Sequence, residues 1–533
     1  MSGGERGQQG RGDIGWPLRR AANLCGDDVA VVDGARSVTY AELDRRVGAL
    51  RCALDELGVS PEGRIGFLGA NSLAHLECWI GVPSAGRSLV SLNFRLAPAE
   101  LAFIANDCGL ELLIVDHAQL ETGRALEAQV KTLRGLVLDD AGEPPADCIA
   151  YEQLVTRKPS AARELDGQAL AAISYTGGTT GAPKGVMLSH ENLLANARHN
   201  LIATKHSHAD RWLHVCPMFH VAGTANIFAC TWVGAQQIVL PRFDATAVLA
   251  AVERHQVTHT VLVPTMLAML IDALEQAQDT QLPSLRHIQY AASPISPALQ
   301  RRVLERFECD IAQFYGMTEA APTVTELSAE DHRRGFSGEE PYASRLSGIG
   351  APVVGVETEV RGIDGAGLGP GEIGELHVRG PNVMLGYWNR PEETRAALIN
   401  GWYRTGDAAR ADTDGYLYVV DRLKDMIISG GENVYSVEVE AALLEHEAVA
   451  EAAVFAIPHS RWGEAVHAVV ATKPGRAVEE AELIEHCRAL IAGYKVPGSI
   501  ELRSEPLPKS GAGKLLKGKL RDPYWAGHDR RVS

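Results

Sequence analysis

A run of small and hydroxyl-bearing residues has the composition of a phosphate-binding loop. Residues 170–190 read Leu-Ala-Ala-Ile-Ser-Tyr-Thr-Gly-Gly-Thr-Thr-Gly-Ala-Pro-Lys-Gly-Val-Met-Leu-Ser-His. We expect a strand over 170–175, then a loop over 176–185, and Ser189 is a favourable N-cap for the helix that follows. Glycines let phosphate oxygens approach backbone N–H groups, threonines add hydroxyl donors, and Lys184 adds positive charge. A surface turn would explain the glycines but not the threonines and the lysine, so the pattern predicts phosphate binding.

Six other segments of the chain form an ordered set with this loop. In chain order they are Pro217-Met218-Phe219-His220, Phe314-Tyr315-Gly316-Met317-Thr318-Glu319, Tyr403-Arg404-Thr405-Gly406-Asp407, Asp421-Arg422-Leu423-Lys424-Asp425, Gly430-Gly431-Glu432-Asn433 and Leu507-Pro508-Lys509-Ser510-Gly511-Ala512-Gly513-Lys514. Together with the loop, they resemble the ordered motifs of the adenylate-forming superfamily, especially its acyl-CoA synthetases of the fatty-acid and 4-coumarate types. The resemblance covers nearly the whole chain. The superfamily usually has Ser where this chain has Gly177, so one hydroxyl donor is lost.

The resemblance implies a two-step reaction on a small-molecule carboxylic acid. The acid would attack the α-phosphorus of ATP and release pyrophosphate, and the thiol of CoA would then displace AMP from the acyl-adenylate. The implied cofactors are ATP and Mg²⁺, with CoA as co-substrate. Because the first step brings two anions together, positioning and electrostatic stabilisation should dominate catalysis.

The same resemblance assigns roles to individual residues. The implied ATP- and AMP-binding residues are Thr176, Gly177, Gly178, Thr179, Thr180, Gly181, Lys184, Ala292, Ser293, Pro294, Phe314, Tyr315, Gly316, Met317, Thr318, Asp407 and Arg422. The implied catalytic residues are Lys514, His220 and Thr318. The implied magnesium ligands are Glu319 and Thr179, the CoA-binding residues are Gly430, Gly431 and Glu432, and the hinge residue is Lys424. By this reading, Lys514 reaches the reacting oxygens in one orientation of a small domain, and CoA enters in another.

The implied acyl pocket contains one informative departure. Its residues would be His220, Val221, Gly223, Asn226, Ala291, Ala292, Phe314, Gly316 and Met317. Many superfamily members with aryl or long-chain substrates carry Gly at the position of Phe314, and a benzyl group there should shorten or redirect the pocket. Medium-chain fatty, aryl and bulky alicyclic acids all stay open. A stretch with His206, His208, His214 and His220 lacks a regular metal-ligand spacing and is interpreted as not binding metal.

Three alternatives to an acyl-CoA synthetase share parts of this pattern. An acyl-AMP ligase that loads the phosphopantetheine of a carrier protein would keep every adenylation residue but would not need the Gly-Gly-Glu-Asn segment. A noncatalytic nucleotide-binding scaffold should have lost Lys514, Glu319 or Asp407, and all three are present. A luciferase-like oxygenase is compatible with the motifs but is rarer among such chains.

The distribution of apolar residues predicts a multidomain α/β protein. Short apolar runs such as residues 64–69 and 110–115 alternate with helical patterns such as 73–85 and 98–107, which is typical of layered parallel sheets. A glycine-rich, turn-rich stretch over 341–380 predicts a β-rich subdomain. The expected domains are therefore a large N-terminal ATP- and acyl-binding domain over 1–421, a hinge over 422–424 and a mobile α+β domain over 425–533. In the last of these we expect the order helix, strand, strand, helix, strand.

Composition limits the compartment and the partners. The chain has 533 residues with a net charge of −16, which disfavours binding to nucleic acid or to an anionic membrane surface. Its nine cysteines include no C-x-x-C pair, which is typical of reduced thiols. The N-terminus lacks the apolar segment of a signal peptide, and the longest uncharged stretch, 218–241, is too polar for a transmembrane segment and fits a helix followed by a strand. We expect a cytoplasmic protein; a homodimer is compatible with the sequence.

Overall fold

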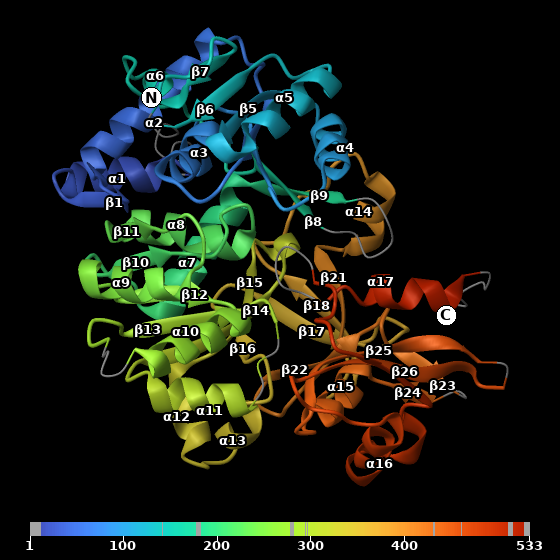
Figure 1. Ribbon diagram of the computed structural model, residues 1–533. Helices are drawn as coiled ribbons and strands as arrows, with labels where there is room; N and C mark the ends of the chain where they lie inside the picture. Colours follow the sequence, from blue (N-terminus) through green and yellow to red (C-terminus); the bar gives the residue numbers. More distant parts are fainter. Residues whose placement is uncertain are drawn as a thin grey trace, which may run out of the picture. The chain divides into compact units, whose positions relative to one another are not determined.

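The computed structural model describes residues 12–140, 142–176, 183–277, 282–293, 295, 297–429, 432–459, 461–509 and 515–526 (Figure 1). The chain divides into two compact units. The first unit comprises Met1–Glu357 and Val378–Tyr403, and the second comprises Thr358–His377 and Arg404–Ser533. This division follows compactness alone, so the hinge at 422–424 stays a prediction. The layered α/β class predicted from the sequence is confirmed by the sheets and helices described next.

Eight described strands form one sheet of the first unit, in the order β19-β9-β8-β4-β3-β5-β6-β7. Their bounds are β3 Arg64–Leu68, β4 Ser88–Leu92, β5 Leu110–Asp116, β6 Leu136–Asp139, β7 Cys148–Ala150, β8 Leu170–Thr176, β9 Lys184–Ser189 and β19 Gly386–Tyr387. The strands from β8 through β4 and β3 to β7 are parallel, whereas β9 is antiparallel to both β8 and β19. The predicted loop over 176–185 is shorter than expected, because the β8–β9 register already pairs Thr176 with Lys184.

A second sheet of the first unit has nine described strands, in the order β16-β15-β14-β13-β12-β10-β11-β1-β2. Their bounds are β1 Val29–Asp33, β2 Arg36–Thr39, β10 Arg211–His214, β11 Gln236–Val239, β12 His259–Leu262, β13 His287–Ala291, β14 Asp310–Gly316, β15 Thr323–Leu327 and β16 Ala351–Pro352. The strands from β14 through β10 to β1 run parallel, and antiparallel strands close both edges. The carboxyl ends of β13 and β14 therefore lie at one edge, where α/β proteins bind ligands.

Helices cover both sheets and fill the space between them. One core joins residues of β1 and β3 to apolar side chains of α1 Trp16–Cys25, α2 Tyr40–Glu56, α3 Leu73–Ser84, α7 His190–Thr204 and α8 Val221–Val233. A second core packs α9 Ala245–His255, α10 Pro264–Gln276 and α11 Pro297–Arg306 on the nine-stranded sheet. A third packs α4 Pro98–Cys108 and α5 Leu120–Gln129 on the eight-stranded sheet. The first unit is thus a stack of alternating helical and sheet layers.

The second unit contains two sheets and three longer α-helical segments among its described residues. One sheet includes β17 Glu357–Arg361, β18 Gly374–Arg379, β21 Trp402–Ala411 and β22 Leu417–Arg422. The other has the order β24-β23-β26-β25, with β27 beside β26, and the strands are β23 Ile427–Ser429, β24 Glu432–Val434, β25 Val449–His459, β26 Gly463–Thr472 and β27 Ser499–Arg503. The helices are α15 Ser436–Leu444, α16 Glu480–Leu490 and α17 Lys517–Arg521. The predicted order helix, strand, strand, helix, strand is found in α15, β25, β26, α16 and β27, but the short strands β23 and β24, which were not predicted, precede it.

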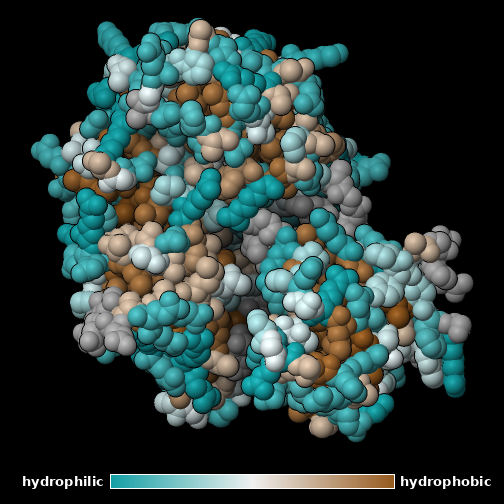
Figure 2. Space-filling model, in the orientation of Figure 1, coloured by the Kyte–Doolittle hydropathy of each residue, from teal (hydrophilic) through white to brown (hydrophobic). Residues whose placement is uncertain are grey.

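No described helix is both long enough and apolar enough to cross a membrane. On the face shown in Figure 2, hydrophobic side chains occur in separate patches among hydrophilic ones. The uncharged stretch 218–241 instead supplies α8 and β11, as its composition predicted.

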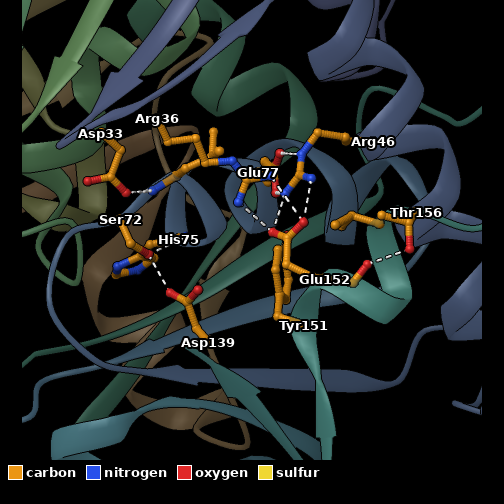
Figure 3. A network of polar contacts seen from close by, with 12 residues as sticks. Asp33, Arg36, Arg46, Ser72, His75, Glu77, Asp139, Tyr151, Glu152 and Thr156 are labelled. Atoms are coloured by element: carbon orange, nitrogen blue, oxygen red, sulfur yellow. Dashed lines mark hydrogen bonds and ion pairs between the residues drawn. The ribbon is translucent and has the colours of Figure 1, made fainter. Parts of the chain in front are cut away.

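A buried ion cluster ties α2 and α3 to α6 Tyr151–Val155 (Figure 3). The Arg46 guanidinium donates to both carboxylate oxygens of Glu77 and to both of Glu152, the latter at 2.9 Å each. Arg46 and Glu77 are buried, and burial raises the pKa of Glu77. Replacing Glu77 would leave the buried Arg46 guanidinium with one carboxylate partner, the half-exposed Glu152, and loss of a buried charge partner is costly.

We therefore expect Glu77→Gln to lower the stability of the first unit by about 3 kcal/mol. The measurement is the lowest unfolding transition in differential scanning calorimetry. The matched control is Arg124→Ala, which removes the ion pair with Asp147 at the surface and should cost no more than about 1 kcal/mol. Equal shifts for both variants would contradict a structural role for the buried cluster.

Candidate active site

The carboxyl end of β14 and the turn after it contain five of the predicted nucleotide-binding residues. Phe314, Tyr315 and Gly316 end the strand, Met317 follows, and Thr318 and Glu319 begin the short 3-10 helix Thr318–Ala320. The chain turns sharply here: the Met317 N–H donates to the Pro322 carbonyl at 3.0 Å. The turn requires Gly316, because a Cβ there would lie 1.7 Å from that carbonyl oxygen.

The neighbouring strand β13 ends beside this turn. Its last residue, Ala291, is paired with Phe314 across the parallel register. Ala292 follows with a φ of +75°, a left-handed conformation that is strained for a residue with a Cβ. Such strain is concentrated at functional sites, and here it falls on a residue predicted to contact the nucleotide. Ser293, the next predicted residue, is partly exposed.

Tyr387 lies between two predicted site residues that are distant in the sequence. Its phenol donates to the Glu319 carboxylate at 2.9 Å, and its ring centroid is 5.4 Å from the Lys184 ammonium. Burial, with a contribution from Glu319, raises the pKa of Tyr387, and burial also raises that of the adjacent Tyr403. Both phenols therefore stay protonated and available as donors. The structure therefore places two groups against the Tyr387 side chain. One is the Lys184 ammonium, at the end of the predicted phosphate loop, and the other is the Glu319 carboxylate, the expected metal ligand.

The predicted acyl residues fall on α8 and on the two strand ends. His220 is the N-cap of α8, and its Nδ1 accepts from the Ala222 N–H at 3.3 Å. Val221 is buried, and Gly223 has no room for a side chain, since a Cβ would lie 2.2 Å from the Pro217 carbonyl oxygen. Asn226 is buried, and its side-chain amide donates to Gln289 on β13 at 3.0 Å. That bond joins the helix to the strand that ends at Ala291.

Asp407 and Arg422 lie opposite each other in the second unit, on the antiparallel strands β21 and β22. The Arg422 Nε is 3.2 Å from the Asp407 Oδ1, and the Asp407 carboxylate is buried while Arg422 is half-exposed. A second contact holds the backbone of Asp407, because its N–H donates to the Thr405 hydroxyl at 3.0 Å. An ionised carboxylate held this way can accept hydrogen bonds from two vicinal hydroxyls.

The expected hinge residue, Lys424, lies two residues after Arg422 in the sequence. Burial lowers the pKa of Lys424 to about 8, although Asp425 opposes the shift. Nearby, the buried Asp421 carboxylate accepts from the Ser436 hydroxyl at 3.0 Å. Lys517 donates to that hydroxyl at 2.7 Å and pairs with Glu440 at 2.6 Å. Lys517 thus connects α17 to α15 and to the end of β22.

Several predicted residues lie outside the described part of the chain. They are Gly177, Gly178, Thr179, Thr180, Gly181, Pro294, Gly430, Gly431 and Lys514. Of the predicted CoA residues only Glu432 is described, as the exposed first residue of β24.

The sequence analysis did not identify two residues that contact predicted site residues or their neighbours, Tyr387 and Lys517. Tyr387 follows Gly386 in a two-residue strand, which is too short to show a pattern. Lys517 comes three residues after Lys514, and that proximity was the available signal. Both act through contacts with residues distant in the sequence, so spacing alone could not assign them.

The layered α/β unit with this strand-end site, followed by a small α+β unit, defines the class of adenylate-forming enzymes. Two sequence families match the chain: AMP-binding enzyme over residues 18–388, and AMP-binding enzyme C-terminal domain over residues 438–514. The chain belongs to the AMP-binding enzyme family.

Curated relatives and solved structures of this family span almost the whole chain. Feruloyl-CoA synthase from an Amycolatopsis species is 39% identical over 95% of this chain and 98% of its own. Long-chain-fatty-acid–CoA ligase from Thermus thermophilus is 36% identical over 95% and 94%. The O-succinylbenzoate CoA synthetase of Bacillus subtilis, solved with its acyl-adenylate intermediate, is 30% identical, with a TM-score of 0.81 over 97% of this chain and 99% of that one. The same synthetase has been solved with ATP and a magnesium ion, also with a TM-score of 0.81, over 95% and 98%.

We expect Lys424 to lose its proton near pH 8, two units below an ordinary lysine, because its charged form is poorly solvated. The measurement is competitive acetylation at a series of pH values, read by mass spectrometry for each lysine peptide. The half-exposed, acid-paired Lys509 is the control with which the profile of Lys424 is compared. Parallel profiles for the two lysines would contradict the assigned environment of Lys424.

Proposed function

We propose that this acid–thiol ligase, an AMP-forming acyl-CoA synthetase, activates a planar aromatic carboxylic acid. The enzyme forms an acyl-adenylate with release of pyrophosphate and then transfers the acyl group to CoA. The aromatic preference is supported by the 39% identity to feruloyl-CoA synthase. Phe314, which is buried beside Ala291, would limit the length of the acid.

The observation that best supports the proposal is that Lys184 and Glu319 both contact Tyr387. One residue supplies positive charge next to the phosphate loop, and the other supplies a carboxylate for a cation that bridges phosphate oxygens. We infer that Glu319 holds Mg²⁺, because a hard cation prefers carboxylate oxygen and Tyr387 fixes that carboxylate. When bound, the ion would neutralise phosphate charge as the pyrophosphate leaves.

The remaining roles follow from chemistry and from family resemblance. Thr318 and the loop residues would donate to phosphate, Asp407 would accept the ribose hydroxyls, and Arg422 would orient Asp407. His220 would lie next to the substrate carboxylate. Lys514 would donate to the transition state of adenylation and withdraw before thioester formation, with Lys424 in the hinge.

The direct test is a panel of acids: ferulate, cinnamate, benzoate, octanoate and palmitate. Pyrophosphate release is measured with ATP and Mg²⁺, with and without CoA, and thioester is quantified by chromatography. The proposal expects the highest kcat/KM for an aromatic acid and one thioester per pyrophosphate when CoA is present. Pyrophosphate release without thioester in the presence of CoA would instead favour loading of a carrier protein, and a preference for palmitate would overturn the aromatic assignment.

Lys514→Ala should slow adenylate formation about 10²–10³-fold, the usual cost of losing one donor to a developing charge. Thioester formation from supplied acyl-adenylate and CoA should fall much less, because that step does not need this lysine. The two half reactions are measured separately in a stopped-flow instrument, with the exposed Lys519→Ala as control. Adenylation at the parent rate would exclude Lys514 as the catalytic residue.

Tyr387→Phe should weaken the response to magnesium. Losing a hydrogen bond to a charged carboxylate costs about 1.5 kcal/mol or more, so the free Mg²⁺ concentration that gives half-maximal rate should rise about tenfold. The rate is measured against free Mg²⁺ at saturating ATP. Tyr494→Phe, at an exposed tyrosine, should leave the curve in place, and an unchanged curve for Tyr387→Phe would remove its positioning role.

Phe314→Gly should extend acceptance toward longer acids, because it removes a benzyl group from the end of β14. We expect the ratio of kcat/KM for octanoate to that for ferulate to rise at least about tenfold, which corresponds to about 1.4 kcal/mol. Phe314→Leu keeps most of the apolar volume and serves as the control. If both variants keep the parent's chain-length profile, Phe314 does not limit the pocket.

A further inference from the structure

Two histidines and an aspartate meet at the amino ends of β10 and β12. His206 and Asp210 lie in the loop that precedes β10, and His259 is the first residue of β12. The His206 Nδ1 is 3.7 Å from one Asp210 oxygen, and the His259 Nδ1 is 3.7 Å from the other. One ligand atom from each of the three residues can be chosen so that all lie within 4.8 Å of one another. All three side chains are more than nine-tenths buried.

The tautomer of His206 is set by its other nitrogen. Asn226 uses its amide N–H to donate to Gln289, so its carbonyl oxygen is left for the His206 Nε2, at 3.2 Å. The Nε2 must then carry the proton. The His206 Nδ1 has no hydrogen-bond partner and is wholly buried. This nitrogen and a carboxylate oxygen of Asp210 therefore face each other without a hydrogen bond, and a cation between them would bind both.

The donor set also suits a cation. Two imidazoles and one carboxylate are ligands that zinc accepts in proteins.

We propose that His206, Asp210 and His259 form a zinc site with a water molecule as the fourth ligand. The present separations are slightly wider than those of a tetrahedral site, in which ligands lie about 2.0–2.2 Å from the ion. Two small changes complete it. The Thr258 hydroxyl, 2.8 Å from the His259 Nδ1, turns its proton toward the Arg211 carbonyl, 3.3 Å away. The half-exposed Arg286, now paired with Asp210, moves into solvent.

The proposed zinc site lies away from the predicted nucleotide-binding residues at the strand ends. β10, β12 and β13 are parallel, so their amino ends lie at the edge opposite the strand ends that hold Ala291 and Phe314. An ion there would join the loop before β10 to β12. Histidine spacing along 206–220 could not indicate it, because the second imidazole, His259, comes from a different strand.

The test is metal analysis of the full-length protein, purified without a histidine tag. After equilibration with Zn²⁺ and dialysis against metal-free buffer, we expect close to one zinc per chain by elemental analysis. The Co²⁺-loaded protein should show the intense visible bands of tetrahedral cobalt. Trp212, whose ring centroid is 5.0 Å from that of His206 and 6.0 Å from that of His259, should make part of the tryptophan fluorescence sensitive to Co²⁺.

Variants separate this site from surface chelation. His206→Gln and His259→Gln should each lose the cobalt bands and the stoichiometric zinc while keeping ATP-dependent pyrophosphate release. His208→Gln is the matched control, since it alters an exposed group, with Cys25 and Asp28, that could also chelate metal. Zinc well below one per chain in the parent protein would overturn the proposal without reference to any variant. So would zinc that persists in both His206→Gln and His259→Gln, or that disappears only in His208→Gln.

Discussion

Mutual repulsion of two anions is the constraint on which this structure depends. A carboxylate and a triphosphate must come within bonding distance on a chain whose net charge is −16. The overall field of the protein opposes both ligands, so attraction has to come from a few groups held at short range. The parallel sheets hold these groups in place, because their strand ends position donors from separate parts of the chain at one edge.

Tyr387 illustrates how such a site is held. It pairs with Glu319 through its hydroxyl and faces Lys184 with its ring, so one partly buried side chain contacts both an anion and a cation. If Lys184 and Glu319 formed a direct ion pair, neither would be free for the phosphate and the metal ion that we propose they bind. A neutral phenol between them keeps both charges available, and the raised pKa of Tyr387 ensures that the phenol stays neutral.

The sequence predicted the elements well where local chemistry decides them. Ser189 caps α7 as expected, with Asn192 completing a reciprocal capping pair, and strands β3, β5 and β8 begin at the predicted residues. Prediction failed where elements are short or contacts are distant. The three-residue strands β23 and β24 are too short to show a periodicity, and Lys184 belongs to a strand because its partner Thr176 lies across a hairpin. The roles of the predicted site residues still rest on motif resemblance, because chemistry at a residue is not visible in its position.

The residues on both sides of positions 510–514 are anchored within the second unit. On one side of residues 510–514, Lys509 and the backbone of Leu507 bind the Glu451 carboxylate. On the other side, Lys517 binds Ser436 and Glu440. Five residues between two anchored flanks can extend only a limited distance, at most about 3.6 Å per residue. A large displacement of Lys514 relative to the first unit would therefore require motion of the second unit as a body, and we proposed above that the partly buried Lys424 belongs to the hinge for such a motion.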